Sequence, residues 1–135
     1  MLPTVPLTTV DGDTVSTAAL LGGPVVVNIW YSTCPPCERE LVDFADVHGE
    51  VGDQVRFVGV DPVDTAETMQ AFATDRGVAY ELLRDADAAF VDALGIVGFP
   101  TTLFVDANGV VVGQYGVLDA AELRLHLQHH FGVVA

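Results

Sequence analysis

The chain has 135 residues, half of them hydrophobic, which is sufficient for one globular domain with a sizeable core. Its five basic residues are all arginine and stand against 19 acidic residues. The net charge of −14 argues against nucleic acid and anionic membranes as partners, because both would be repelled. No run of about 18 apolar residues occurs, so the sequence predicts no membrane-spanning helix. We expect a single, monomeric domain over residues 1–135.

The first part of the chain predicts a small hairpin followed by a buried strand. Residues 1–6 contain two prolines and are expected to form a loosely held lead-in. An Asp-Gly turn within residues 7–16 is typical of a β-hairpin, and residues 16–21 predict one helical turn. The uninterrupted apolar run of residues 25–30 indicates a buried central strand.

The rest of the chain alternates between helices and strands. After Cys37, apolar residues recur at intervals of three and four, which predicts an amphipathic helix that ends near residues 49–52. Residues 55–60 predict a parallel strand, because a helix separates them from the first strand. The later elements are expected to be a helix over 65–77, an extended segment over 80–83, a helix over 85–95, a hairpin over 101–115 and a last helix from Asp119 to Phe131.

The two cysteines stand together as Cys34-Pro35-Pro36-Cys37, between the buried strand and the first long helix. With Cys34 as the N-cap, both prolines occupy helical positions whose N–H groups would have no partner in the helix, so they are tolerated. The helix dipole and the N–H of Cys37 would favour the Cys34 thiolate. We therefore expect a redox-active pair in which Cys34 attacks and the more buried Cys37 resolves the mixed disulfide.

Two other uses of the cysteine pair are less favoured. A zinc site would need two more ligands, and the only candidates at a suitable spacing, His126 and His130, lie far along the chain. A purely structural disulfide would close so short a loop that it constrains the unfolded chain little. We expect no metal and no cofactor, and we expect His126, His129 and His130 to be surface or interface groups.

The motif WYSTCPPC, followed later by GFPTT, resembles the thioredoxin superfamily, and the similarity extends from Pro24 to the C-terminus. The N-terminal hairpin, a strand–helix insertion over residues 61–83 and Asn28 in the central strand resemble its TlpA-like and cytochrome c maturation branch. The resemblance implies the thioredoxin fold, an α/β architecture with a central mixed sheet flanked by helices. It also implies an extracytoplasmic protein whose leader or anchor is absent from this chain.

The same resemblance places a substrate-binding region around Cys34. Pro100 of GFPTT matches the family's cis-proline, and the backbone of Phe99 would pair with a substrate segment. Trp30 matches the first aromatic residue of the family motif, whereas Thr33 stands where tryptophan is common, which leaves the groove less aromatic. The substrate-binding residues that the resemblance implies are Trp30, Thr33, Pro35, Pro36, Phe99 and Pro100.

An acid that serves the cysteines is expected from the insertion. Cytosolic thioredoxins have a buried aspartate where this chain has Asn28, which cannot act as a base and is expected to be hydrogen-bonded internally. The resemblance to TlpA-like reductases places the acid at Asp64, with Asp61 as the alternative. A carboxylate there would have a raised pKa and would exchange a proton with Cys37. Asp64 equally suits the N-cap of the following helix.

The sequence therefore predicts a thiol-disulfide oxidoreductase that acts on cysteine-containing proteins. The resemblance implies a membrane thiol-disulfide carrier as a second partner, and leaves open whether substrates such as apocytochrome c are reduced or oxidised. A thiol peroxidase would use Cys34 against peroxide, but the nearest arginine, Arg39, lies one turn past Cys37. A non-catalytic binding module would function without Cys34. Asn28 and the insertion argue against a cytosolic, tryparedoxin-like reductase.

Overall fold

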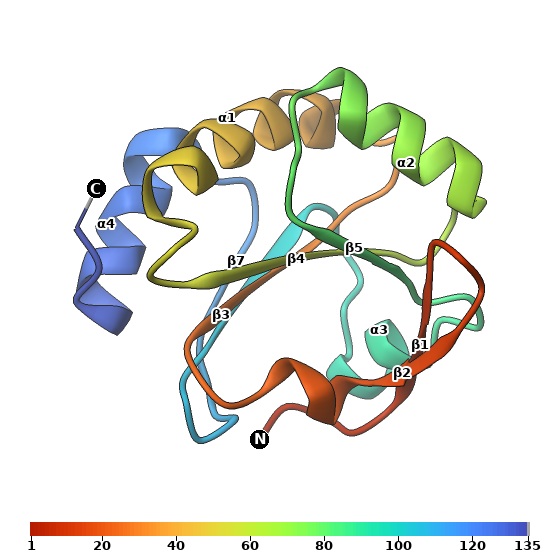
Figure 1. Ribbon diagram of the computed structural model, residues 1–135, viewed down its shortest axis with the longest axis horizontal. Helices are drawn as coiled ribbons and strands as arrows, with labels where there is room; N and C mark the ends of the chain where they lie inside the picture. The colour runs from red at the N-terminus through yellow and green to blue at the C-terminus, as the bar shows by residue number, and fades with distance from the viewer. Residues whose placement is uncertain (135) are drawn as a thin grey trace.

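A seven-stranded mixed sheet forms the centre of the computed structural model, which describes residues 1–134 (Figure 1). The strands lie in the order β2-β1-β5-β4-β3-β6-β7; β3, β4 and β5 are parallel, and the other neighbouring pairs are antiparallel. Their bounds are β1 Pro6–Thr9, β2 Thr14–Ser16, β3 Val25–Ile29, β4 Arg56–Asp61, β5 Glu81–Arg84, β6 Thr101–Val105 and β7 Val111–Tyr115. This arrangement confirms the expected α/β architecture.

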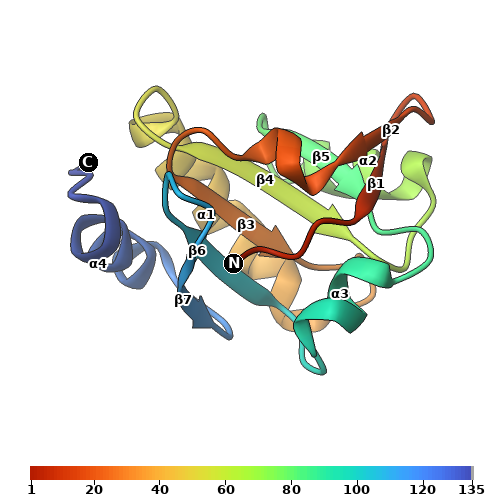
Figure 2. The ribbon, with the colours of Figure 1, turned by 90° about the horizontal axis from the view of Figure 1, so that it is seen from below.

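Helices cover both faces of the sheet (Figures 1 and 2). They are the 3₁₀ helix η1 (Thr17–Leu20) and the α-helices α1 (Pro35–Val51), α2 (Ala66–Asp75), α3 (Ala89–Leu94) and α4 (Ala120–Phe131). Helices α1, α2 and α4 lie on one face, and α3 lies on the other face together with η1 and the N-terminal segment.

The central strand β3 requires this cover because all five of its residues are buried. Val25, Val27 and Ile29 belong to the core on the α3 side. Val26 belongs to the core beneath α1 and α4, and Trp30, which follows the strand, packs in the cluster beneath α1 and α2. Successive strand residues point to opposite faces, so a strand that is covered twice needs an unbroken apolar run.

Most of the predicted elements are present within one or two residues of their expected bounds. The first hairpin joins the sheet where β1 pairs with β5, which belongs to the predicted insertion. The predicted start of the last helix is confirmed by a capping box. The Asp119 carboxylate accepts a hydrogen bond from the Glu122 N–H at 2.8 Å, and the Glu122 carboxylate accepts one from the Asp119 N–H at 3.1 Å.

The segment before β1 is not the loose lead-in that the sequence predicted. Leu2 is buried in the core, and its N–H donates to the carbonyl of Gly109 at 2.7 Å. The buried hydroxyl of Thr17 donates to the carbonyl of Pro3 at 2.7 Å and accepts from the N–H of Val5 at 3.0 Å. The segment is therefore held by contacts with distant parts of the chain, which its local proline content does not reveal.

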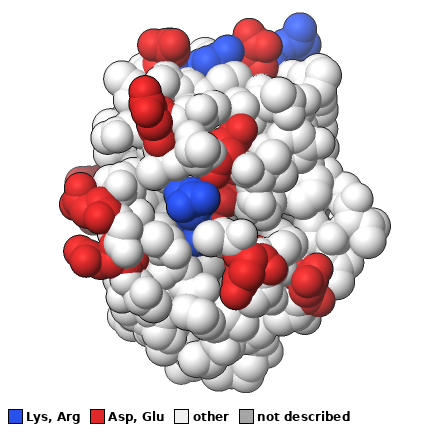
Figure 3. All heavy atoms as spheres, turned by 90° about the vertical axis from the view of Figure 1, so that its right-hand side faces the viewer, with Lys and Arg blue, Asp and Glu red and all other residues white. Residues whose placement is uncertain are grey.

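Acidic side chains outnumber basic ones on the face shown in Figure 3, in keeping with the net charge of −14. Within residues 1–134, three of the five arginines form ion pairs, and each pair includes at least one exposed side chain, so solvent screens the attraction and the pairs stabilise the fold little. These pairs are Arg56–Glu81, Arg76–Glu38 and Arg124–Glu50. Within residues 1–134, no helix is both long and apolar enough to cross a membrane.

Replacing the Thr17 hydroxyl tests the attachment of the N-terminal segment. We expect Thr17→Val to lower the free energy of unfolding by about 1–3 kcal/mol, because the part-buried N–H of Val5 and carbonyl of Pro3 lose their hydrogen-bond partner. Urea denaturation measures this change. Thr14→Val, at an exposed position of β2, serves as the control and should change the value by less than about 0.5 kcal/mol. Equal stability of Thr17→Val and wild type would show that the attachment is not needed.

Candidate active site

Cys34 and Cys37 form a disulfide at the N-terminus of α1, with their Cα atoms 5.3 Å apart. Cys34 is the N-cap residue, with φ −99° and ψ 107°, and the two prolines are the first helical residues. The prolines start the helix without removing an intrahelical hydrogen bond, as predicted. Cys34 has 3% of its surface exposed and Cys37 has none, so Cys37 is the more buried cysteine.

The hydrogen bond expected from Cys37 to the Cys34 sulfur is not formed in this oxidised pair. The N–H of Cys37 donates to the carbonyl of Cys34 at 3.1 Å, and the Cys34 side chain makes no capping hydrogen bond. The reason is that the sulfur is already bonded to Cys37, and the intervening prolines have no N–H to offer. Cys34 stands at the N-terminus of α1, where the helix dipole favours a thiolate, and the contribution of the Cys37 N–H in the reduced protein stays a prediction.

Trp30 lies in the core beneath the cysteines and does not line their surface. None of its surface is exposed, and its ring stacks on Phe72 with the centroids 5.5 Å apart. A Cβ atom at Gly59 would lie 2.9 Å from Nε1 of Trp30, so the glycine makes room for the indole. This corrects the expectation that Trp30 contacts substrate, since that side chain supports the site from within the core.

The other predicted substrate-binding residues lie around Cys34. The Phe99–Pro100 peptide bond is cis, as the resemblance implied. Residue 101, the first of β6, pairs with residue 29, the last of β3. Pro100 therefore lies at the same end of the sheet as the start of the connection to Cys34. Phe99 packs against the cluster that contains both cysteines. The residues Thr33, Pro35 and Pro36 are exposed beside Cys34.

Glu40 is a buried acid that the sequence analysis did not identify. It lies on α1 one turn after Cys37 and has 1% of its surface exposed. Its carboxylate accepts hydrogen bonds of 2.8 Å from Nδ2 of Asn28 and from the N–H of Leu118. Nδ2 of Asn28 also donates to Oγ1 of Thr102 at 3.1 Å, which confirms that the asparagine is bonded internally. Position 40 lies on the buried face of α1. This spacing was the feature of the sequence that could have identified Glu40 as a buried acid.

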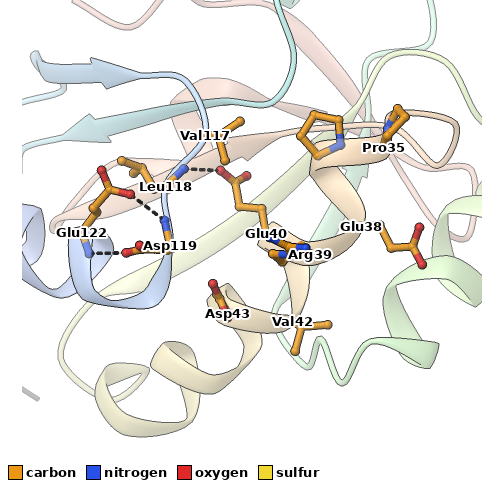
Figure 4. A pocket seen from close by; sticks show the side chains of 11 residues that line it. Pro35, Glu38, Arg39, Glu40, Val42, Asp43, Val117, Leu118, Asp119 and Glu122 are labelled. Carbon is orange, nitrogen blue, oxygen red and sulfur yellow. Dashed lines mark hydrogen bonds between the residues drawn. The ribbon is translucent and has the colours of Figure 1, made fainter.

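Burial is the main influence on the ionisation of Glu40. It raises the pKa of Glu40 from 4.5 to about 7, although the hydrogen bonds from Leu118 and Asn28 favour the charged form. Glu40 also lines a groove of about 760 Å³ between the start of α1 and the connection from β7 to α4 (Figure 4). Its lining residues are Pro35, Pro36, Glu38, Arg39, Glu40, Val42, Asp43, Val117, Leu118, Asp119 and Glu122.

The structure brings together the two alternative acids of the insertion, Asp61 and Asp64. The Asp64 carboxylate accepts hydrogen bonds of 2.7 Å from both the N–H and the hydroxyl of Ser32. The N-cap of α2 is Thr65, which accepts from the N–H of Thr68, so the interpretation of Asp64 as the helix cap is wrong. Asp61 ends β4 and is buried next to the Asp64 carboxyl.

Two histidines of α4 are more buried than the sequence suggested. His126 and His130 are half-buried against Tyr115 of β7, and His129 is exposed. The rings of Tyr115 and His126 stack with their centroids 3.8 Å apart, and the Tyr115 hydroxyl makes a 2.6 Å hydrogen bond with Nε2 of His130. These histidines therefore join α4 to the edge of the sheet. Residues 1–134 contain no group of three His, Cys, Asp or Glu side chains arranged to hold a metal ion.

Fold and site together define a class: a thioredoxin-fold protein with a cysteine pair at the N-terminus of its first long helix, at the end of the central strand. The chain belongs to the AhpC/TSA family, whose model matches residues 1–118.

Curated relatives carry names that describe thiol chemistry. The thiol-disulfide oxidoreductase ResA of Halalkalibacterium halodurans is 31% identical over 103 residues, which are 76% of this chain and 58% of that protein. The thiol:disulfide interchange protein DsbE of Haemophilus influenzae is 33% identical over 95 residues, which are 70% of this chain and 51% of that protein. The chain thus spans a little over half the length of these relatives.

Solved structures show the same architecture over nearly the whole chain. The structure of MTB dsbF in its mixed oxidised and reduced forms has a TM-score of 0.84 and 28% identity, covering 96% of this chain and 98% of that one. A secreted Mycobacterium tuberculosis disulfide oxidoreductase homologous to E. coli DsbE has a TM-score of 0.77 and 25% identity, covering 88% and 90%.

The raised pKa of Glu40 predicts a pH dependence of stability. Between pH 4.5 and about 7, the folded protein holds a proton that the unfolded chain has released. The free energy of unfolding should therefore fall as the pH rises through this window and level off above it. The fall from this group is of order 3 kcal/mol.

Glu40→Gln should reduce the slope by about half, because Asp61, whose pKa is also raised to about 7, still holds a proton in the folded protein across the same window. Urea midpoints measured from pH 4.5 to 8 test this expectation. Asp46→Asn, at an exposed position of the same helix, should keep the wild-type slope. A slope that persists undiminished in Glu40→Gln would contradict the assignment.

Proposed function

We propose that this protein is a thiol-disulfide oxidoreductase that exchanges disulfides with extracytoplasmic protein substrates through Cys34 and Cys37. The observation that carries the proposal is the disulfide between these residues at the N-terminus of α1, with Cys37 more deeply buried than Cys34. The names of the relatives and of the solved structures support it.

In the reducing direction, the Cys34 thiolate attacks one sulfur of a substrate disulfide, forms a mixed disulfide and releases the first substrate thiolate. The Cys37 thiolate then attacks the Cys34 sulfur, the mixed disulfide breaks and the second substrate thiolate leaves. The substrate has gained two electrons, and the Cys34–Cys37 disulfide is restored. The reverse sequence oxidises a dithiol substrate, and the reduction potential of the pair decides which direction prevails.

Cys37 must lose its proton before it attacks, and we assign Glu40 as the acceptor. Glu40 is buried one turn further along the same helix, its pKa of about 7 suits proton exchange near neutral pH, and the groove connects it with solvent. Asn28 orients this carboxylate. The direct proton role predicted for Asp64 stays a prediction.

The substrate is proposed to lie across the exposed residues Thr33, Pro35 and Pro36, with the backbone of Phe99, before Pro100, pairing with it. We place the protein outside the cytoplasm, because one structural relative is described as secreted. A membrane thiol-disulfide carrier would return electrons to the pair or accept them from it. No metal or other cofactor enters the proposed exchange.

Single cysteine variants separate the roles of the two thiols. With insulin as the disulfide substrate and dithiothreitol as the reductant, both Cys34→Ala and Cys37→Ala should lose at least 99% of the exchange rate, since each step needs its own thiolate. When Cys37→Ala is reduced, freed of dithiothreitol and then mixed with insulin, it should accumulate a mixed disulfide, detected by non-reducing mass spectrometry, because the resolving thiol is missing.

The control is Cys34→Ala, which should form no such adduct, since the remaining Cys37 is fully buried. Exchange at the wild-type rate in Cys34→Ala would refute the proposal, and a wild-type protein that exchanges with insulin not at all would favour a non-catalytic binding module. Rapid sulfenic acid formation at Cys34 in peroxide, without exchange on insulin, would favour a thiol peroxidase instead.

A further inference from the structure

The segment that leads from β3 to Cys34 is held by a carboxyl pair at the end of β4. We propose that Asp61 and Asp64 are positioning residues of the redox site: Asp64 anchors the backbone at Ser32, and a proton shared with Asp61 keeps Asp64 in place. This inference rests on the proposed function, because it concerns how the fold presents Cys34 to a substrate.

The anchor is formed by two hydrogen bonds to one carboxylate. Ser32 lies two residues before Cys34, in a connection where the N–H of Cys34 donates to the carbonyl of Tyr31 at 3.3 Å. The N–H and the hydroxyl of Ser32 each donate to a different oxygen of Asp64 at 2.7 Å. Such short bonds to a charged acceptor are stronger than neutral ones, so Asp64 fixes both the backbone and the side chain of the connection.

Asp64 is itself held from two strands. Oδ1 of Asp61 accepts hydrogen bonds of 2.9 Å from the N–H groups of Val63 and Asp64. The carbonyl of Asp64 accepts a hydrogen bond of 3.0 Å from Nε of Arg84, which is the register partner of Asp61 in β5. The turn after β4 therefore has little freedom to carry the Asp64 carboxylate away from Ser32.

The remaining oxygen of Asp61 indicates the shared proton. Asp61 is 1% exposed, and its buried Oδ2 meets no donor among residues 1–134. The neighbouring Asp64 carboxyl is also an acceptor, so the two carboxyl groups attract each other only when one of them is protonated. Burial and this contact raise the pKa of Asp61 to about 7, and the hydrogen bonds from Asp61 and Ser32 outweigh burial to lower that of Asp64.

The proton therefore belongs to Asp61, and the charge belongs to Asp64. The charged groups on the adjoining elements are Arg84 of β5, Asp85 after it and Glu67 in the first turn of α2. The N–H of Asp85 donates to the Asp61 carbonyl, and its carboxylate is taken up by N–H groups of α3. Above about pH 7, Asp61 loses its proton, two like charges meet in a buried site, and the hold on Ser32 weakens.

The amide proton of Ser32 reports this event directly, because its acceptor is the carboxylate in question. We expect its NMR chemical shift in the oxidised protein to titrate with a midpoint near pH 7, and its protection from hydrogen exchange to fall about tenfold across that midpoint. In Asp61→Asn, the amide offers a permanent N–H to Asp64 and keeps an oxygen for the two backbone donors. Its Ser32 signal should then be flat from pH 5.5 to 8.5.

Matched variants complete the test. Asp53→Asn, at an exposed position, and Glu40→Gln should both retain the inflection at Ser32. In Ser32→Ala, the residue-32 amide should also retain it, because the N–H still faces Asp64. A Ser32 signal that is flat in wild type, or an inflection that persists in Asp61→Asn, would overturn the proposal.

The positioning role needs a second readout. The ratio of insulin reduction rates at pH 8 and pH 6 should rise at least threefold in Asp61→Asn relative to wild type, since the anchor no longer weakens. An unchanged ratio would show that Asp61 and Asp64 affect only the local structure, and it would overturn their proposed role at the redox site. Failure of the proposed function is distinguishable, because the wild type would then exchange with insulin at no pH, whereas the Ser32 signal is measured without substrate.

Discussion

The position of Cys34 depends on one constraint: the residue must end the connection from β3 and also be the N-cap of α1. Its extended backbone and the two prolines that follow satisfy both requirements, because the helix begins where N–H groups are not needed. The central strand fixes the other side of the site, since β6 begins beside its end with the residue that follows Pro100. The sheet thus determines which groups can meet the cysteine pair.

Two buried carboxyl groups then lie on either side of the chain that carries the cysteines. Glu40 is held by Asn28 and Leu118 beneath α1, and Asp61 supports Asp64 beneath the connection at Ser32. Burial raises the pKa of both Glu40 and Asp61 to about 7, so the surroundings of the redox pair are expected to change protonation near neutral pH. We propose different roles for the two groups: Glu40 exchanges a proton with Cys37, and Asp61 holds Asp64 in position at Ser32.

The sequence predicted what local patterns determine and missed what distant contacts determine. The apolar run of β3, the prolines at the start of α1 and the start of α4 at Asp119 depend on local sequence, and all three were predicted. Glu40 was missed because its partner Leu118 lies 78 residues away. Asp64 was misassigned as a possible cap because Thr65 supplies the same capping chemistry, whereas its partner Ser32 is 32 residues distant. The burial of Trp30 likewise depends on Gly59 and Phe72.

The most direct test of the account is the reduction potential of the Cys34–Cys37 pair, measured by equilibrating the protein in thiol-disulfide buffers and trapping the free thiols. We expect a reversible two-electron equilibrium, reached from either side, at a potential between about −270 and −120 mV, the range of proteins that exchange disulfides. A value below about −300 mV would mark a structural disulfide, and it would contradict the proposal that this pair exists to react.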